Sequence, residues 1–324
     1  MKRIFCLAMV MLLAFSLFSA CGNASSSSES TAPAESSEPT EGVKKPAMNI
    51  YQKSDPTQDN VFNILMIGNS HCYYYADELY SIAAAAGIKV RVSNVYHSGC
   101  IIKQHYQWWK EGLGNYTFIT HDENGRTAVE GATLEYCLKQ ANWDVISLQS
   151  GTTDFAAKPP EQVISETREM RKELWEHIKT QFPMSKYYWH HSWSFQVGAN
   201  KFGIQYDEPS KQHELDQKLA TIAKQVCSED NLLRVPTGPA WRIVRDGGYD
   251  DLCSRIGVTG DYGHDGDVGG GQYLNACVWF ETLLGQSCIG NTWRPDYNLS
   301  EDMIAMLQKA AHDAVAQMKA EDGV

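Results

Sequence analysis

Ser70 is the first residue of this chain whose type and position could do chemistry. It ends a Gly68-Asn69-Ser70 corner that follows the apolar run "FNILMI" of residues 62–67, at the point where a helix-like segment begins. A serine there places its hydroxyl beside the free backbone N–H groups of a first helical turn, which can hold a developing oxyanion. The alternative is that Ser70 caps the helix, a common use of serine.

Asp261 and His264 could supply the base that such a hydroxyl needs. They stand three residues apart in "TGDYGHDGDVGGGQYL", residues 259–274, just before another helical segment. At this spacing the carboxylate can bond one imidazole nitrogen and fix its tautomer, which leaves the other nitrogen to take a proton from a hydroxyl. The pair completes a nucleophilic set only if the fold brings this loop to the one that holds Ser70.

The elements that must position these loops alternate between strands and helices. Apolar runs predict strands at residues 61–67, 89–95, 143–149, 186–191 and 231–236, and helical patterns predict helices at 76–86, 161–181, 208–227 and 300–320. Such alternation predicts one doubly wound, three-layer α/β domain with a mostly parallel five-stranded sheet. In such sheets the functional site lies outside the carboxyl ends of the strands, where both candidate loops fall.

Residues 115–130 interrupt this alternation. They carry alternating side chains around Asn124-Gly125, a dipeptide that favours a type I′ turn. We expect an inserted β-hairpin there, and its place between the second and third strands makes it a candidate rim or lid for the site.

The first 60 residues do not read as part of the domain. Residues 1–21 have a Lys2-Arg3 head, an apolar stretch and small residues before Cys21, which resembles a bacterial lipoprotein signal with Cys21 as the lipidated residue. An uncleaved membrane anchor is the alternative. Residues 22–60 are rich in Ser, Glu and Pro and predict a disordered tether. We therefore expect a protein exported to the cell surface and anchored to the membrane by lipid, with residues 61–324 as its folded domain.

The charge and the residue content of the chain limit the ligands and partners that it could bind. The net charge of -11 argues against nucleic acid, because phosphates require clustered Lys and Arg. Of nine Cys, Cys6 leaves with the signal and Cys21 is assigned to lipid, so the remaining seven cannot all pair; export allows disulfides without saying which. Asp265 and Asp267 lie among glycines but lack the spacing of a calcium loop, and we expect neither a metal nor a cofactor.

The ordered motifs resemble those of the SGNH, or GDSL-type, hydrolases. The set "ILMIGNS", "SGCIIKQH", "WDVISLQ", "VPTGPAWRIVR" and "GQYLNACVWFETLLG" is similar, more closely, to a bacterial SGNH-like family of unknown function, over about residues 61–288. The resemblance implies a flavodoxin-like fold.

The same resemblance implies a role for each matching residue. Ser70 matches the nucleophile and first oxyanion donor, Gly99 the second donor, His264 the base and Asp261 the residue that orients it. The third donor departs from the pattern, because Thr153 stands where the hydrolases usually have Asn. Gln149 carries an amide at the end of the same predicted strand, so it is our choice, with Thr153 as the alternative.

Together these features predict an extracytoplasmic serine esterase that removes small acyl groups, O-acetyl first among them, from carbohydrate. Aromatic side chains could contact such a substrate or could simply pack: Tyr73, His105, Trp109 and Trp193. Two other functions stay open. One is a non-catalytic glycan-binding lipoprotein, which the Thr153 departure favours, and the other is a lipase or thioesterase for long acyl chains.

Overall fold

The computed structural model describes residues 60–324 except residue 202 and residues 250–269. All of these residues belong to one compact unit, Glu41–Val324. The predicted signal at residues 1–21 and the predicted tether at residues 22–60, except residue 60, lie outside the described residues, as do Asp261 and His264.

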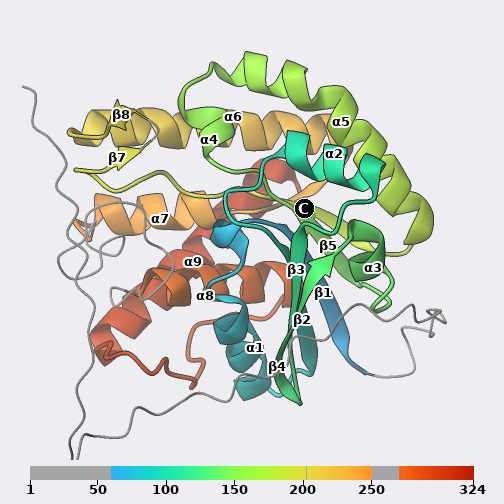
Figure 1. Ribbon diagram of the computed structural model, residues 1–324. Helices are drawn as coiled ribbons and strands as arrows, with labels where there is room; N and C mark the ends of the chain where they lie inside the picture. The colour runs from blue at the N-terminus through green and yellow to red at the C-terminus, as the bar shows by residue number, and fades with distance from the viewer. Residues whose placement is uncertain (1–59, 202, 250–269) are drawn as a thin grey trace, which may run out of the picture. The chain divides into compact units, whose positions relative to one another are not determined.

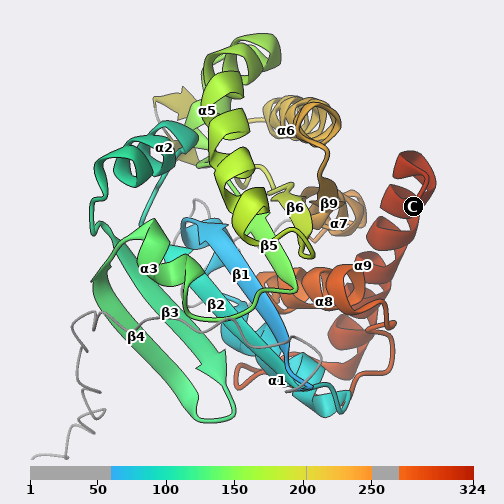
Figure 2. The same ribbon diagram turned by 90° about the vertical axis from the view of Figure 1, so that its right-hand side faces the viewer.

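A seven-stranded sheet in the order β4-β3-β2-β1-β5-β6-β9 forms the centre of the domain (Figures 1 and 2). Its parallel strands fall where the apolar runs predict them: β1 (Phe62–Gly68), β2 (Val90–Tyr96), β5 (Val145–Leu148), β6 (Lys186–His190) and β9 (Leu233–Val235). Numbered along the chain, these five strands have the order 2-1-3-4-5 of a flavodoxin-like sheet. The predicted doubly wound fold is confirmed.

The hairpin of β3 (Tyr116–Asp122) and β4 (Gly125–Ala132) extends this sheet instead of covering the site. Strand β3 pairs antiparallel with β2, so that Thr117 faces Tyr96 and His121 faces Val92. The Asn124-Gly125 turn consequently lies at the amino end of the parallel strands, opposite the edge where the candidate site lies. The expectation of a rim or lid was wrong because a β-hairpin reverses direction, and its tip returns to the level at which β2 begins.

Helices cover both faces of the sheet, as Figure 2 shows. One face packs against α1 (Ala76–Ala85), α7 (Thr237–Asp246), α8 (Gly271–Leu284) and α9 (Glu301–Asp322). The other packs against α2 (Ile102–Glu111), α3 (Leu134–Leu138), α5 (Pro160–Gln181) and α6 (Pro209–Asp230). The short elements are η1 (Ser70–Cys72), α4 (Thr153–Ala156), β7 (Asn200–Lys201) and β8 (Ile204–Gln205).

Strand β1 shows why the two cores form. Its side chains alternate across the sheet, so Ile64 and Met66 enter the core beneath α1, α8 and α9, while Leu65 and Ile67 enter the core beneath α5 and α6. All four are fully buried. An uninterrupted apolar run is therefore what a strand covered on both faces requires. Within the described ranges, no helix is long and apolar enough to span a membrane.

Candidate active site

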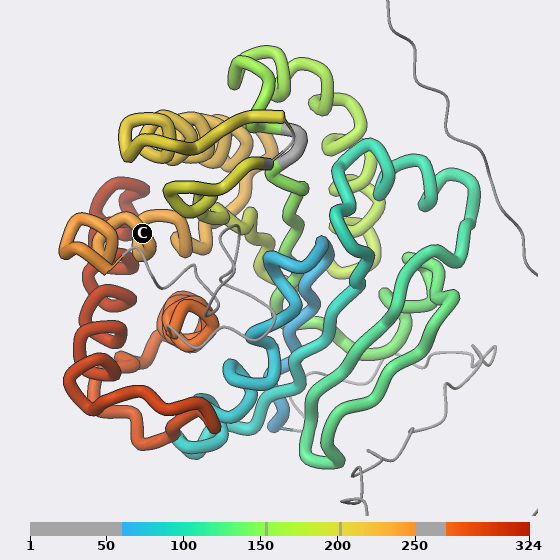
Figure 3. The backbone as a smooth tube through the Cα atoms, turned by 60° about the vertical axis from the view of Figure 1, so that its left-hand side comes forward, coloured from blue at the N-terminus to red at the C-terminus, as the bar shows by residue number. Residues whose placement is uncertain are grey.

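The candidate site lies at the topological switch point of the sheet. Strand β1 pairs with β2 on one side and with β5 on the other, so the loops after these strands leave the sheet next to one another (Figure 3). Ser70 follows β1, Gly99 follows β2 and Gln149 follows β5. Ligands of open α/β sheets bind at such a position, where the loops on either side turn in opposite directions.

Asn69, and not Ser70, caps the turn that follows β1. The Asn69 side-chain oxygen accepts a hydrogen bond from the His71 backbone N–H at 3.0 Å, and η1 begins at the next residue. Helix α1 begins later, after Tyr75, without a side-chain cap. The alternative prediction, that Ser70 caps the helix, was therefore wrong, because Asn69 is the residue that caps this turn. Ser70 itself is half-buried at the start of η1.

The carbonyl group of Cys100 joins all three loops. It accepts hydrogen bonds from the Asn69 side-chain amide and from the Gly151 backbone N–H, each at 3.0 Å. The loops after β1 and β5 are thus both tied to the loop after β2. This function of Asn69 was not predicted from the sequence, although an Asn at a turn commonly bonds backbone groups and could have pointed to it.

Gln149 connects β5 directly to the Ser70 corner. Its Oε1 accepts the Asn69 backbone N–H at 3.2 Å, and its Nε2 donates to the Ser150 carbonyl group. The side chain is 1% exposed and so packed that a Cβ on Gly68 would lie 2.7 Å from Oε1. The amide is therefore held at the corner, and among the described residues one of its two Nε2 hydrogens is engaged, by the Ser150 carbonyl. The alternative donor, Thr153, begins α4.

Gly99 has the backbone conformation that its position demands. Its φ is +65°, in the left-handed region that glycine adopts without strain, and the residue is exposed. The exposed loop of Gly99 precedes Cys100, whose buried carbonyl joins the three loops. The structure thus brings Ser70, Gly99 and Gln149 to one edge of the sheet, whereas the predicted partners Asp261 and His264 lie outside the described residues.

Tyr73 is placed where a substrate could reach it. Its half-exposed ring packs 4.7 Å from the ring of Tyr96 and 4.9 Å from that of Tyr74, and Arg126 donates a hydrogen bond to its hydroxyl at 3.2 Å. Tyr96 is the last residue of β2 and was missed in the sequence, although the end of a parallel strand marks the functional edge. These rings form an aromatic group three residues after Ser70.

His105 and Trp193 are buried, which corrects the expectation that they contact substrate. His105 is fully buried, with Nδ1 2.9 Å from the Tyr116 hydroxyl. Burial and the nearby His97 lower the pKa of His105 to about 3, although a hydrogen bond to the Gln149 backbone acts in the opposite direction. This imidazole is therefore neutral. Trp193 is 1% exposed. Its ring stacks on Trp241 and contacts His71.

Trp109 and Cys72 also have packing partners. The Trp109 ring lies 4.6 Å from the ring of His177 on α5 and 4.3 Å from the ammonium of Lys110. Cys72 is fully buried and donates its thiol to the Asn69 carbonyl. Burial raises the pKa of Cys72 to about 12, so this thiol is not a nucleophile that competes with Ser70. Among the described side chains, no three His, Cys, Asp or Glu gather as a metal site.

The strand order and the helices on both faces define a doubly wound α/β protein with a flavodoxin-like sheet. A family model described as "Domain of unknown function (DUF4886)" matches residues 63–314, and this chain belongs to that family. The resemblance to a bacterial family of unknown function is thereby confirmed. None of the curated proteins compared with the chain matches it.

Three solved structures illustrate this similarity. A DUF4886 family protein from Bacteroides uniformis is 23% identical, with a TM-score of 0.67 over 79% of this chain and 95% of that one. A putative GDSL-like lipase from Parabacteroides merdae is 18% identical, with a TM-score of 0.43 over 68% and 94% of the two chains. An acetylxylan esterase from Geobacillus stearothermophilus is 16% identical, with a TM-score of 0.41 over 68% and 93%. The similarity to the DUF4886 family protein shows the fold alone, and none of the three establishes an activity.

Proposed function

We propose that this protein is a serine esterase that removes small acyl groups, in particular O-acetyl groups, from carbohydrate. The observation that supports it most is the convergence of the Ser70 corner with the loops of Gly99 and Gln149 at the switch point, joined through the Cys100 carbonyl. In the proposal, this arrangement would gather a hydroxyl and several N–H donors at one place. That combination is what attack on an ester carbonyl needs.

In the proposed reaction, Ser70 Oγ attacks the ester carbonyl carbon, and His264 takes the hydroxyl proton. Asp261 would hold the imidazole in the tautomer that leaves one nitrogen free. The Ser70 and Gly99 backbone N–H groups and the Gln149 amide would then stabilise the oxyanion. Each well-aimed donor lowers the barrier by about 3 kcal/mol.

The protonated imidazole then gives its proton to the leaving alcohol, and an acyl-enzyme remains on Ser70. Water, activated by the same imidazole, attacks this ester, and the collapse of the second tetrahedral intermediate releases the acid and restores the Ser70 hydroxyl. The N–H donors act in both halves of the cycle, since both pass through an oxyanion.

The aromatic group of Tyr73 and Tyr96 supports carbohydrate as the acyl carrier. Sugars present C–H faces that pack on aromatic rings, and these two rings are half-exposed beside the Ser70 corner. A long acyl chain would need an apolar channel instead. Rates measured along a series from acetyl to long-chain esters separate the two, and a maximum at long chains would favour a lipase or thioesterase.

A Ser70→Ala variant tests the proposal. We expect it to lose the hydrolysis of 4-nitrophenyl acetate and of O-acetylated oligosaccharide by at least about 1,000-fold, because nucleophilic attack needs the hydroxyl. Ser98→Ala is the matched control, since Ser98 is exposed in the loop after β2, and it should keep the full rate. Equal rates for Ser70→Ala and the wild type would remove Ser70 as the nucleophile.

A second function rests on the Thr153 departure. If the third donor is missing, the protein would bind glycan without turning it over. A fluorophosphonate that fails to label Ser70 in a protein that still binds acetylated oligosaccharide would favour this alternative. Labelling that is lost in Ser70→Ala would favour the esterase.

We further infer that the enzyme works outside the cytoplasm, attached to the membrane through lipid on Cys21 and separated from it by residues 22–60. The motif of residues 1–21 supports this inference. The wild-type protein should partition with detergent, and Cys21→Ala should not acquire the lipid mass. An unmodified Cys21 in a protein recovered from membranes would contradict lipidation.

A further inference from the structure

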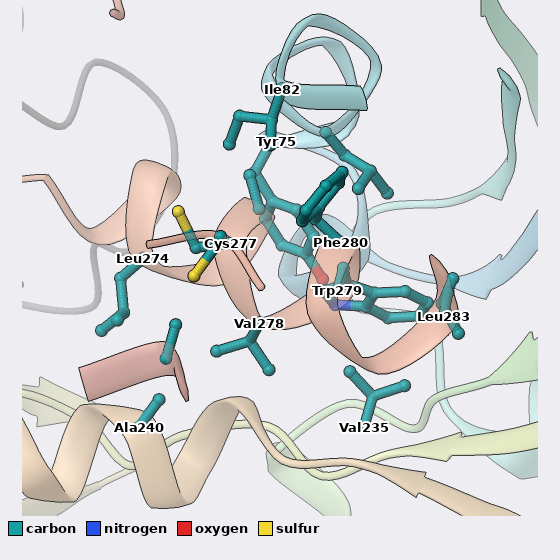
Figure 4. Packing of buried hydrophobic residues seen from close by; sticks show 14 of the residues in the cluster. Tyr75, Ile82, Val235, Ala240, Leu274, Cys277, Val278, Trp279, Phe280 and Leu283 are labelled. Atoms are coloured by element: carbon teal, nitrogen blue, oxygen red, sulfur yellow. The ribbon is translucent and has the colours of Figure 1, made fainter. Parts of the chain in front are cut away.

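Two cysteines lie together in the core between α8 and α9, far along the chain from the Ser70 corner. Cys277 is on α8, one turn after Tyr273 and one turn before Glu281, so these three side chains share one face of the helix. Cys288 is in the segment that follows α8. Both cysteines are fully buried, and Figure 4 places Cys277 among the packed side chains of α8.

Hydrogen bonds from two helices fix the position of Cys288. Its backbone N–H donates to a Glu281 carboxylate oxygen at 3.0 Å, and its thiol donates to the Gln308 carbonyl of α9 at 3.3 Å. The Gln308 side chain in turn donates to the Tyr273 hydroxyl at 2.9 Å. Cys288 is therefore held against the α8 face that carries Cys277, because its partners lead to Glu281 and Tyr273, one turn on either side of Cys277.

Among the cysteines that the structure describes, this placement selects one pair. Cys72, Cys137 and Cys227 lie on η1, α3 and α6, Cys100 lies in the loop after β2, and both thiols of the selected pair are free in this structure. The number and spacing of the cysteines alone could not make that choice. Two cysteines that lie on facing segments, 11 positions apart, need little backbone movement to become bonded.

We propose that Cys277 and Cys288 form a disulfide when the protein folds in an oxidising environment. Two S–H bonds break and one S–S bond forms, while two electrons and two protons pass to a small-molecule or protein disulfide, which is reduced to two thiols. The exchange runs during folding, before α9 covers the pair. In the folded, reduced protein, the neighbouring Cys277 and burial raise the pKa of Cys288. A raised pKa disfavours the reactive thiolate.

The bond would fasten the segment after α8 to the helix itself. That segment carries Asn291, whose side-chain amide donates to the Ile82 carbonyl at the end of α1 at 2.9 Å. A disulfide at Cys288 would thus hold a connection between α8 and α1 as well as one with α9. It is independent of the proposed esterase activity, because none of these residues lies in the loops after β1, β2 and β5.

Refolding with defined oxidants tests the disulfide. The full-length protein is unfolded and reduced in guanidinium chloride, refolded in a mixture of reduced and oxidised glutathione, alkylated and digested. We expect a linked Cys277–Cys288 peptide and two fewer free thiols than in protein refolded with dithiothreitol. The near-ultraviolet circular dichroism of the two samples shows whether both have folded.

Two variants make the result specific. Cys227→Ala should still lose two thiols on oxidative refolding, whereas Cys288→Ala should lose none from this pair. Wild-type protein that refolds in the glutathione mixture with both Cys277 and Cys288 fully alkylated would overturn the proposal. So would linkage of Cys277 to any other cysteine in most of the molecules.

Discussion

Replacing Asn69 by alanine tests two effects of this residue, one on the stability of the protein and one on the proposed chemistry at Ser70. The change removes the hydrogen bond to the Cys100 carbonyl and the one from the His71 backbone N–H, both 3.0 Å long. The Cys100 carbonyl keeps the Gly151 N–H, but the His71 N–H loses its side-chain acceptor. Each of these two buried hydrogen bonds contributes about 0.5–1.5 kcal/mol net, so we expect a loss of about 1–3 kcal/mol in unfolding free energy.

Asn291 provides a matched control for this change. Its side-chain amide also donates to a distant carbonyl, at 2.9 Å to Ile82, and its oxygen also accepts the backbone N–H two residues later, at 3.0 Å from Trp293. Asn291 is half-buried, whereas Asn69 is 1% exposed, so Asn291→Ala should lose somewhat less stability. It lies in the segment after α8, away from the loops that join at Cys100.

The assay combines urea unfolding with the kinetics of 4-nitrophenyl acetate hydrolysis. If Asn69 holds the proposed oxyanion donors in place, losing the aim of one donor costs about 3 kcal/mol, which is roughly a 100-fold fall in kcat with little change in KM. Asn291→Ala should keep the wild-type kcat below its unfolding transition. Equal kcat values for the two variants would refute the idea that Asn69 positions the oxyanion donors. An unchanged unfolding free energy of Asn69→Ala would refute the energy expected for its two hydrogen bonds.

Two further predictions concern stability alone. In Gly68→Ala the new Cβ would lie 2.7 Å from Gln149 Oε1, so the variant should lose about 1–3 kcal/mol in urea unfolding; wild-type stability would show that the corner can relax. Burial holds the pKa of both His105 and His191 at about 3, so below the unfolded value of about 6.5 only the unfolded chain takes up these protons. The unfolding free energy should therefore fall as the pH drops from 7 to 5, by up to about 1.4 kcal/mol per pH unit for each histidine. His105→Gln should show a smaller fall. Equal slopes of unfolding free energy against pH for this variant and the wild type would contradict a neutral His105.

The parallel sheet could be predicted from sequence because its signals are local. The run "FNILMI" is apolar except for Asn63 because β1 is buried on both faces, whereas the four other runs are more mixed. The predicted lengths differ from those of the observed strands by a few residues. Alternation with helices then leaves few topologies, and the carboxyl edge follows from strand direction. Ser70, Gly99 and Gln149 could be placed at that edge for the same reason.

The surroundings of each side chain could not be predicted in this way. His105 and Trp193 have the residue types of a sugar-binding surface, and only their partners Tyr116 and Trp241, from other elements, show that they are core residues. The hairpin tip was likewise misplaced, since the register of β3 on β2 decides at which end of the sheet the turn lies.

The sequence by itself determined the order of the elements, the edge at which the chemistry lies and the residue types available there. Only the tertiary structure decided that Asn69 caps the corner, that the Cys100 carbonyl joins three loops, and that Cys288 lies against the α8 face that carries Cys277. Strand and helix patterns depend on neighbours a few residues away, whereas these contacts join residues that are distant along the chain or belong to different elements. Their geometry exists only once the sheet and its helices have packed.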